Sequence, residues 1–525
     1  YATVNPSVRL EWTADINEIK YLFRKKLKGE EKWTIPDTLQ PEETTFTDKN
    51  ITLGIGYEYS VEKWTNDYDG FGYVYAGIGL PPAEFRGKVL VLIDSTIIEP
   101  LQFEINRFIR DLEGEGWIVI TRPAPRTENF SPEAVKYTKS IIVEEFRRDS
   151  LLLKSLILLG RIAVPYSGAW AIDGHSWDHS GAWAADAYYS VIDGEWTDYS
   201  VNNDSVKRNE NINVANDGKF DQVAIPGLSR LQTGRIDMYN LPDFEVGETE
   251  LIRRYLDKNH KYRNKEFTAR QRALIDDGFG MYSPEAYAAT AWMNFAALVG
   301  PDSIDEGSFR YDLREKGYIW AYGCNSGSFI SVHNTAYTSE FDSLPYHGVF
   351  TALFGSYNGD YDSRNNLLRA SIASNPSILT CAWTGKPFWY LHHMALGEPI
   401  GYSTMLVQNN KTLYLSTGIH GLKGPHVALF GDPTLRMHII APPANLKIET
   451  SIDKDYNRKA VLQWEHSKDE ILGYNIYRAE YSGQIFTKIN EEPVKDSVFT
   501  DEHPFLLSNY YKVRAIRLEI GRAHV

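Results

Sequence analysis

The middle of the chain, from residue 80 to residue 441, alternates between short apolar runs and longer amphipathic segments. Lys88–Asp94 is the first of these runs, and it has the length and composition of a buried strand. Strands that alternate with helices form parallel sheets whose two faces are covered by the helices. We therefore predict one α/β domain over 80–441 with two halves, 80–235 and 236–441.

One predicted strand of the second half ends in a cysteine. The apolar run Tyr318–Tyr322 is followed by Gly323, by Cys324 and then by small polar residues. In α/β sheets, ligands and chemistry collect beyond the carboxyl ends of the strands. A thiol at that point, next to a glycine that lets backbone N–H groups approach, is typical of a cysteine nucleophile with an oxyanion pocket. The alternative is a small buried side chain, because free cysteine is among the most buried residue types.

Charge and cysteine content exclude several classes of function. The chain has 55 Lys and Arg against 69 Asp and Glu, a net charge of −14, which disfavours nucleic acid as a partner. Its 2 cysteines, Cys324 and Cys381, form neither a disulfide framework nor a zinc-ligand pattern. No apolar run is long enough to span a membrane. The start at Tyr1 leads us to expect a secreted or cell-surface protein cut from a longer precursor.

The two ends of the chain repeat each other. Trp12 precedes Tyr59 by the same spacing that separates Trp464 from Tyr511, and both segments alternate apolar and polar residues. This alternation predicts half-buried antiparallel strands, and hence two small β-sandwiches over 1–79 and 442–525. Both segments resemble fibronectin type III modules that lack a strand. Such modules usually space or tether other domains.

A long irregular segment between Val164 and Arg235 is rich in Asp, Asn and aromatic residues. Loops of this length inside a domain are usually functional or stabilised by a metal. Several carboxylates close to Asx-Gly turns supply the hard oxygen ligands that Ca²⁺ prefers. The alternative is an ordinary loop held by Asx turns. The predicted calcium ligands are Asp193, Asp198, Asp204, Asp217 and Asp221.

Three stretches of the middle domain resemble the gingipain-type cysteine peptidases, which have a caspase-like fold. Tyr322–Phe329 is similar to the family's strand end with the catalytic cysteine. Val427–Leu435 is similar to its closing Gly-Asp-Pro-Ser-Leu segment. The order of Leu158–Gly160, an Asp-rich loop and Gly234–Ile236 before a helix is also similar. The resemblance implies a cysteine endopeptidase with Cys324 as nucleophile and with the backbone around Gly323 and Cys324 as oxyanion donors.

The sequence departs from this family at the general base. The family has a histidine in a Gly-His-Gly at the end of the strand before the cysteine strand, whereas no histidine lies between His260 and His333 here. A thiol without a base stays protonated near its ordinary pKa of about 8.5. We predict His333 as the first candidate for the base. The other candidates are His175, His179, His392, His393, His420 and His426.

Two functions therefore stay open. The first is a gingipain-like cysteine peptidase that acts on a protein or peptide substrate. The second is a catalytically inactive peptidase fold that serves as a scaffold for binding or assembly at the cell surface. The missing Gly-His-Gly favours the scaffold, and the many Trp and Tyr residues between 166 and 200 suit a surface that binds a partner.

Overall fold

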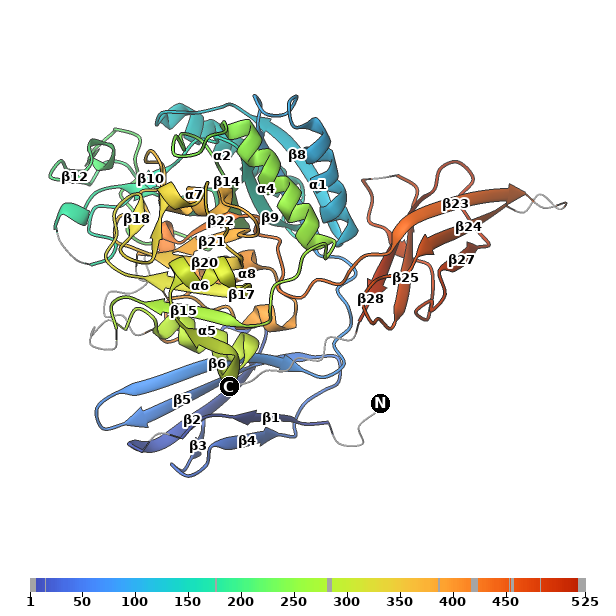
Figure 1. Cartoon of the computed structure of the whole chain (residues 1–525), viewed down its shortest axis with the longest axis horizontal. Helices are drawn as coiled ribbons and strands as arrows, with labels where there is room; N and C mark the ends of the chain where they lie inside the picture. The colour runs from blue at the N-terminus through green and yellow to red at the C-terminus, as the bar shows by residue number, and fades with distance from the viewer. Residues whose placement is uncertain are drawn as a thin grey trace.

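A large mixed sheet forms the middle of the molecule (Figure 1). The computed structural model describes residues 6–14, 16–174, 177–280, 286–385, 388–416, 424–452, 454, 458–481 and 483–517. Within these residues the largest sheet has ten strands, in the order β16-β15-β17-β20-β21-β22-β14-β9-β7-β8. The prediction of an α/β domain with a mostly parallel sheet is confirmed.

The strands of this sheet come from both predicted halves of the domain. They are β7 (Gly87–Asp94), β8 (Trp117–Ala124), β9 (Leu153–Leu159), β14 (Gln232–Ile236), β15 (Ala273–Asp277), β16 (Ile304–Glu306), β17 (Tyr318–Cys324), β20 (Gly348–Phe354), β21 (Thr380–Trp383) and β22 (Ala428–Gly431). The helices are α1 (Gln102–Gly114), α2 (Pro132–Arg148), α3 (Ala187–Ser190), α4 (Glu248–Arg263), α5 (Ala289–Val299), α6 (Phe309–Glu315), α7 (Leu367–Ala373) and α8 (Ile400–Asn409).

Helices cover both faces of the sheet because successive side chains of a strand point to opposite faces. On β7, Val89 and Val91 belong to the apolar cluster that contains Phe108 of α1. Leu90, between them, belongs to a second cluster that contains Ile142 of α2. The unbroken apolar sequence of β7 therefore reflects burial on both sides.

The direction of the strands changes once within the sheet. β22 pairs antiparallel with β21 but parallel with β14. The strands β7, β8, β9 and β14 consequently run opposite to β15, β16, β17, β20 and β21. The carboxyl ends of the two halves lie at opposite edges of the sheet, so a site at the end of β17 draws its side chains first from β15 and β20.

The N-terminal module, residues 6–77, lies below the α/β domain in Figure 1 and consists of two antiparallel sheets. Its strands are β1 (Val8–Glu11), β2 (Glu18–Leu27), β3 (Asp37–Leu39), β4 (Thr45–Asp48), β5 (Gly56–Thr65) and β6 (Asp69–Gly77). Both sheets contribute to one apolar cluster, with Leu10 from β1 and Tyr59 from β5. The relation of this module to fibronectin type III stays a prediction.

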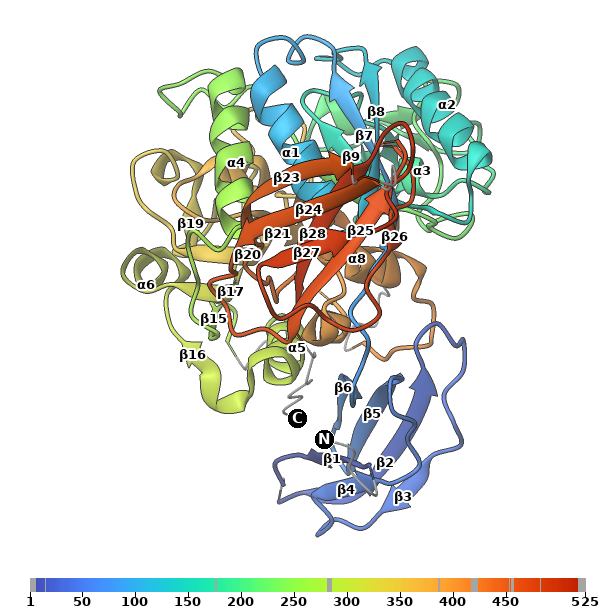
Figure 2. The ribbon, with the colours of Figure 1, turned by 90° about the vertical axis from the view of Figure 1, so that its right-hand side faces the viewer.

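The C-terminal module, residues 444–516, projects from the right of the α/β domain in Figure 1 and faces the viewer in Figure 2. One sheet contains β23 (Ala444–Ile452), β24 (Arg458–Glu465) and β27 (Val498–Asp501), and the other contains β25 (Gly473–Ala479), β26 (Thr487–Lys488) and β28 (Tyr510–Ile516). Trp464 and Tyr474 meet edge to face in the apolar cluster between the sheets, at 5.2 Å between ring centres. No helix among the described residues of the chain has the length and apolar character of a membrane span.

Candidate functional site

Cys324 is the last residue of β17, at the carboxyl edge of the second half of the sheet. Its side chain is 0% exposed, like most of the strand that carries it. The register of the sheet places Asp277 of β15 on one side of Cys324 and Phe354 of β20 on the other. The structure therefore puts the thiol at the strand end that the sequence predicts, but beneath other residues.

The polar neighbours of the thiol include a carboxylate, beside the Tyr322 side chain and the Phe279 N–H, which both lower its pKa. Cys324 Sγ lies 3.4 Å from Asp277 Oδ1, and the thiol donates to it. Burial, and secondly the charge of Asp277, raise the pKa of Cys324 far above its ordinary value. A nucleophilic cysteine needs a neighbour that stabilises the thiolate, such as an imidazolium or another positive charge. Asp277 and burial both favour the protonated thiol instead.

Asp277 ends the strand next to the cysteine strand, where the gingipain resemblance places its Gly-His-Gly. The segment here reads Asp277-Gly278-Phe279-Gly280. The exposed Asp277 carboxylate accepts hydrogen bonds from the backbone N–H groups of Phe279 and Gly280, at 3.2 and 3.0 Å. Gly278 donates its own N–H to the carbonyl of Cys324 at 2.8 Å. This strand end is thus a tight turn built around a carboxylate.

His333 takes part in the loop after Cys324 through its backbone. It lies between the short strands β18 (Ser331–Val332) and β19 (Ala336–Tyr337). Its N–H donates to the Ser326 carbonyl at 2.8 Å, and its carbonyl accepts from Asn325 Nδ2 at 2.9 Å. The side chain of His333 is exposed. Among the described residues, no hydrogen bond joins its imidazole to the thiol of Cys324.

The backbone around Gly323 packs against the β18–β19 hairpin and forms a hydrogen bond to β20. A Cβ at Gly323 would lie 2.4 Å from Thr335 Cγ2, so the glycine allows the β18–β19 hairpin to pack against β17. The N–H that follows Cys324, that of Asn325, donates to the Phe354 carbonyl at 3.1 Å. An oxyanion pocket formed by this amide would have to break that hydrogen bond.

The other candidate histidines have different partners. His179 Nδ1 lies 2.6 Å from Asp173 Oδ2, and its ring packs on Tyr357. Burial lowers the pKa of His179, but the hydrogen bond and charge of Asp173 outweigh burial and raise it. His426 is buried, with Nδ1 3.4 Å from the Ala184 carbonyl. His175 and His420 lie outside the described residues.

Three of the five predicted calcium ligands bind backbone amides. Asp221 accepts from Tyr199 N at 3.0 Å and Val201 N at 2.9 Å, and also from the Thr197 hydroxyl. In the same way, Asp198 accepts from Asn216 and Gly218, and Asp217 accepts from Val214 and Lys219. Asp193 lies 3.8 Å from Arg230, and Asp204 is exposed. Asp217 thus forms an Asx turn with Lys219, whereas Asp198 and Asp221 bind amides of a distant part of the loop. Calcium binding stays a prediction.

A different cluster has the composition of a metal site. Glu58 of β5, His392 and His393 are all buried, and their potential ligand atoms lie within 4.8 Å of one another. Among the described residues this is the one group of three or more such side chains. The local sequence gives no signal for it, because Glu58 belongs to the N-terminal module whereas the two histidines belong to the α/β domain.

The carboxylate of this cluster already has strong donors. Lys26 Nζ lies 2.5 Å from Glu58 Oε1, and the Tyr414 hydroxyl donates to Oε2 at 2.6 Å. His392 Nε2 and His393 Nε2 each lie 3.1 Å from one of the two oxygens. The buried ammonium balances the carboxylate, so a divalent cation would add an uncompensated charge to this interior. The cluster is a buried ion pair of the N-terminal module that His392, His393 and Tyr414 of the α/β domain contact.

Comparison with known proteins gives only weak likenesses. No family model matches the chain, and no curated protein matches it. Among solved structures, the Arg-specific cysteine proteinase gingipain R is 11% identical, with 82% of this chain and 98% of that chain covered and a TM-score of 0.46. A sialyltransferase from Photobacterium damsela is 10% identical over 70% of this chain and 95% of that chain, with a TM-score of 0.13. At these values neither likeness carries an argument about activity.

Proposed function

We propose that this chain is a secreted or cell-surface protein whose α/β domain, of caspase-like type, serves as a scaffold for binding or assembly without cysteine peptidase activity. The observation that carries the proposal is the neighbour of the thiol. Cys324 is fully buried, and its hydrogen-bond acceptor is the carboxylate of Asp277. The fold type is supported by the family-like stretches around Cys324 and at Gly431–Pro433 and by the order of the strands.

A carboxylate cannot replace the histidine of a cysteine peptidase. The ordinary pKa of an aspartic acid is about 3.9, against about 6.5 for histidine and about 8.5 for cysteine. A carboxylate is therefore a much weaker base than an imidazole toward the thiol. As an anion it also repels the thiolate, which is the reactive form of cysteine. Burial of Cys324 adds to this effect, because removal from water disfavours the charged form.

The scaffold role is supported by how the modules are fixed to the domain. Trp33 of the N-terminal module donates to the Leu413 carbonyl at 2.7 Å, and Tyr73 accepts from Leu415 N–H at 2.7 Å. At the other module, Lys265 of the domain pairs with Asp469 at 2.8 Å. These contacts support modules that hold the domain in a set orientation, as fibronectin type III-like spacers do.

Exposed aromatic side chains support the binding of a protein partner. Trp170, Trp177 and Tyr199 all belong to the irregular segment after β9, and they are 64%, 69% and 70% exposed. Tryptophan and tyrosine are enriched at the energetic centres of protein interfaces. We propose this surface, rather than the thiol, as the functional part of the domain.

A second candidate function, peptide-bond hydrolysis by Cys324, is favoured by the position of the thiol at the carboxyl edge of the sheet.

A hydrolysis assay distinguishes the two functions. The full chain is incubated with fluorescently labelled casein and with a pool of fluorogenic peptides, beside a Cys324→Ala variant. The scaffold proposal predicts the same background rate for both proteins across pH 5 to 9. Hydrolysis by the native chain that disappears in Cys324→Ala would establish the peptidase and refute the scaffold proposal. Unchanged thermal unfolding of the variant serves as the control for folding.

A further inference from the structure

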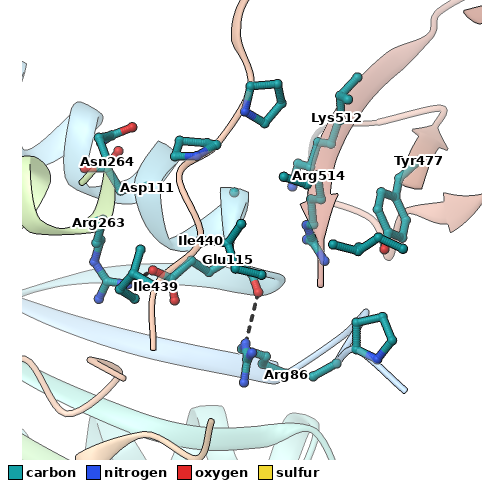
Figure 3. Close-up of a pocket in the computed structure, with 18 of the residues that line it drawn as sticks. Arg86, Asp111, Glu115, Arg263, Asn264, Ile439, Ile440, Tyr477, Lys512 and Arg514 are labelled. Carbon is teal, nitrogen blue, oxygen red and sulfur yellow. Dashed lines mark hydrogen bonds and ion pairs between the residues drawn. The ribbon is translucent and has the colours of Figure 1, made fainter. Parts of the chain in front are cut away.

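A cavity separates the C-terminal module from the α/β domain. Its volume is about 570 Å³, which is within the range of small-molecule sites. Figure 3 shows Lys512, Arg514 and Tyr477 on the module side and Arg263 and Asp111 on the domain side. The linker that carries Ile439 and Ile440 passes between them. The cavity is therefore formed by two parts of the chain and by the segment that connects them.

The charge of the lining is opposite to that of the whole chain. Seven cationic side chains and two carboxylates line the cavity, whereas the chain has a net charge of −14. An acidic protein that collects cations in one cavity creates a local positive potential, and a concave wall strengthens it. The cationic residues are Arg86, Arg110, Arg263, Arg436, Lys512, Arg514 and Arg517.

The two carboxylates are already paired. Glu115 binds Arg263 at 2.5 Å and Arg436 at 3.2 Å. These cations, with Arg86, lower the pKa of Glu115 to about 2 although burial opposes the change. Asp111 lies 2.8 Å from His260 Nδ1. The remaining cations of the lining therefore receive little compensation from carboxylates in the cavity.

On the module side of the cavity, the hydrogen bonds of two cations go to carbonyl oxygens of the α/β domain and of the segment before β7. Lys512 Nζ and Arg514 reach the Glu113 carbonyl at the end of α1, at 3.4 and 3.3 Å, and Arg514 also donates to the Glu84 carbonyl. Burial lowers the pKa of Lys512 to about 8, although Glu113 attracts the ammonium. Arg514 Nε is buried and makes no hydrogen bond within the described part of the chain. An anion in the cavity would place negative charge beside the Lys512 ammonium and the Arg514 guanidinium, which donate to neutral carbonyl oxygens.

Apolar groups complete the lining. Ile439 and Ile440 of the linker, with Leu446 of β23, lie beside the cations. The Tyr477 ring packs against the Arg514 guanidinium at 4.7 Å. A cavity with apolar walls and several fixed guanidinium groups suits an organic molecule with charged ends, because guanidinium groups bind carboxylate and phosphate oxygens in pairs.

We propose that this cavity binds a small organic polyanion, a molecule with at least two phosphate or carboxylate groups. The bound anion would bridge Arg110 of α1 and Lys512 of β28, and would thereby fix the C-terminal module against the α/β domain. The α/β domain and the C-terminal module both contribute arginine side chains to the lining. The site is therefore complete only when the module is docked on the domain. The inference does not depend on whether Cys324 is reactive.

Calorimetric titration of the full chain tests the proposal. Pyrophosphate and citrate are the two probes, titrated at an ionic strength held constant with NaCl. We expect one molecule of at least one probe to bind per chain with a Kd below about 1 mM. Preference for pyrophosphate would assign the site to phosphates, and preference for citrate would assign it to carboxylates. No binding of either probe would overturn the proposal.

Two variants locate the binding. Arg110 is exposed on α1 and Arg517 is half-buried after β28, so we expect the double variant Arg110→Ala, Arg517→Ala to fold. It should bind the preferred probe at least tenfold more weakly. The matched control is Arg147→Ala, which removes an exposed arginine of α2 far from the lining and should change nothing. Equal affinity in the double variant would overturn the site.

Discussion

The thiol of Cys324 and the imidazoles of His392 and His393 both lie beside a carboxylate, but in different parts of the molecule. Cys324 meets Asp277 at the end of a sheet, without an imidazole in contact among the described residues. The two histidines meet Glu58 at the joint with the N-terminal module. The fold thus separates the thiol from these two histidines. A cysteine at a strand end becomes reactive only when its neighbour stabilises the thiolate.

The largest expected effect is at the buried Lys26–Glu58 ion pair, where the N-terminal module contacts the α/β domain. Glu58→Ala leaves the ammonium of Lys26 buried without its partner, because both side chains are almost fully buried. Loss of one partner of a buried ion pair costs about 3 to 5 kcal/mol. We expect the free energy of unfolding in urea to fall by about that amount. The control is Glu11→Ala, at an exposed ion pair with Arg9, which should change it by less than about 0.5 kcal/mol. A loss below about 1 kcal/mol for Glu58→Ala would contradict the account.

The second prediction concerns the free energy of unfolding at acidic pH. Burial, and secondly the charge of His393, lower the pKa of His392 to about 4, against the opposing influence of Glu58. The unfolded chain therefore binds more protons at this residue than the folded chain between pH 6.5 and 4. Neutral His392 therefore contributes to the free energy of unfolding above pH 6.5. This contribution, about 2 to 3 kcal/mol, is lost as the pH falls toward 4.

Urea unfolding at pH 7.5 and at pH 4.5 measures this loss. A His392→Gln variant should show a smaller difference between the two pH values than the native chain, because glutamine does not titrate. Equal pH dependence of the free energy of unfolding in the two proteins would show that protonation of His392 does not destabilise the fold.

A third carboxylate, Asp221, is satisfied by backbone N–H groups rather than by a cation or an imidazole. These hydrogen bonds, with that of Thr197, lower its pKa although partial burial opposes the change. We expect Asp221→Ala to lower the free energy of unfolding by about 1 to 2 kcal/mol, because it leaves several amides without acceptors.

Removal of calcium tests the same loop. Since Asp198, Asp217 and Asp221 already accept N–H groups, the hydrogen-bond account predicts that EDTA leaves the Tm unchanged. The calcium site that the sequence predicts requires a fall in Tm that added Ca²⁺ reverses and that Asp198→Asn abolishes. Either result decides between a loop held by hydrogen bonds from carboxylates to backbone amides and a loop held by a metal.

The smallest effect is expected at Asp277. Burial is the larger cause of the raised pKa of Cys324, and the exposed Asp277 carboxylate is the second. Asp277→Asn should therefore lower the pKa of the thiol by about one unit or less, because solvent screens an exposed charge. Burial raises the pKa of the other thiol, Cys381, to about 11, so Cys381 is replaced to leave a single titrating thiol. The pH profile of thiol alkylation, measured with Cys381→Ala as background, checks the shift. An unchanged profile would remove Asp277 from the account.

The α/β domain could be predicted from the sequence because its strands are apolar on both faces and its helices are amphipathic. β7 and β17 are recognisable in this way, and Cys324 ends its strand as expected. The reversal of β22 could not be predicted, since β22 is only four residues long and strand direction depends on long-range pairing. Short apolar runs carry no information about their direction.

The residues that contact Cys324 and Glu58 could not be predicted from the sequence either. Asp277 reaches Cys324 because β15 pairs with β17 although β16 lies between them in the chain. Glu58 meets His392 only through the docking of one module on another domain. No periodicity encodes such contacts. The sequence could therefore place the thiol, but the group that decides its reactivity is set by strand order.

The pKa of the Cys324 thiol tests the central claim most directly. The rate of alkylation by iodoacetamide is measured across pH 5 to 10.5 in the Cys381→Ala protein, with and without His333→Ala. The account predicts slow labelling at pH 7, a rate that is still rising above pH 9, and no effect of His333→Ala. Rapid labelling below pH 7 that is lost in His333→Ala would contradict it and would identify a thiolate activated by histidine.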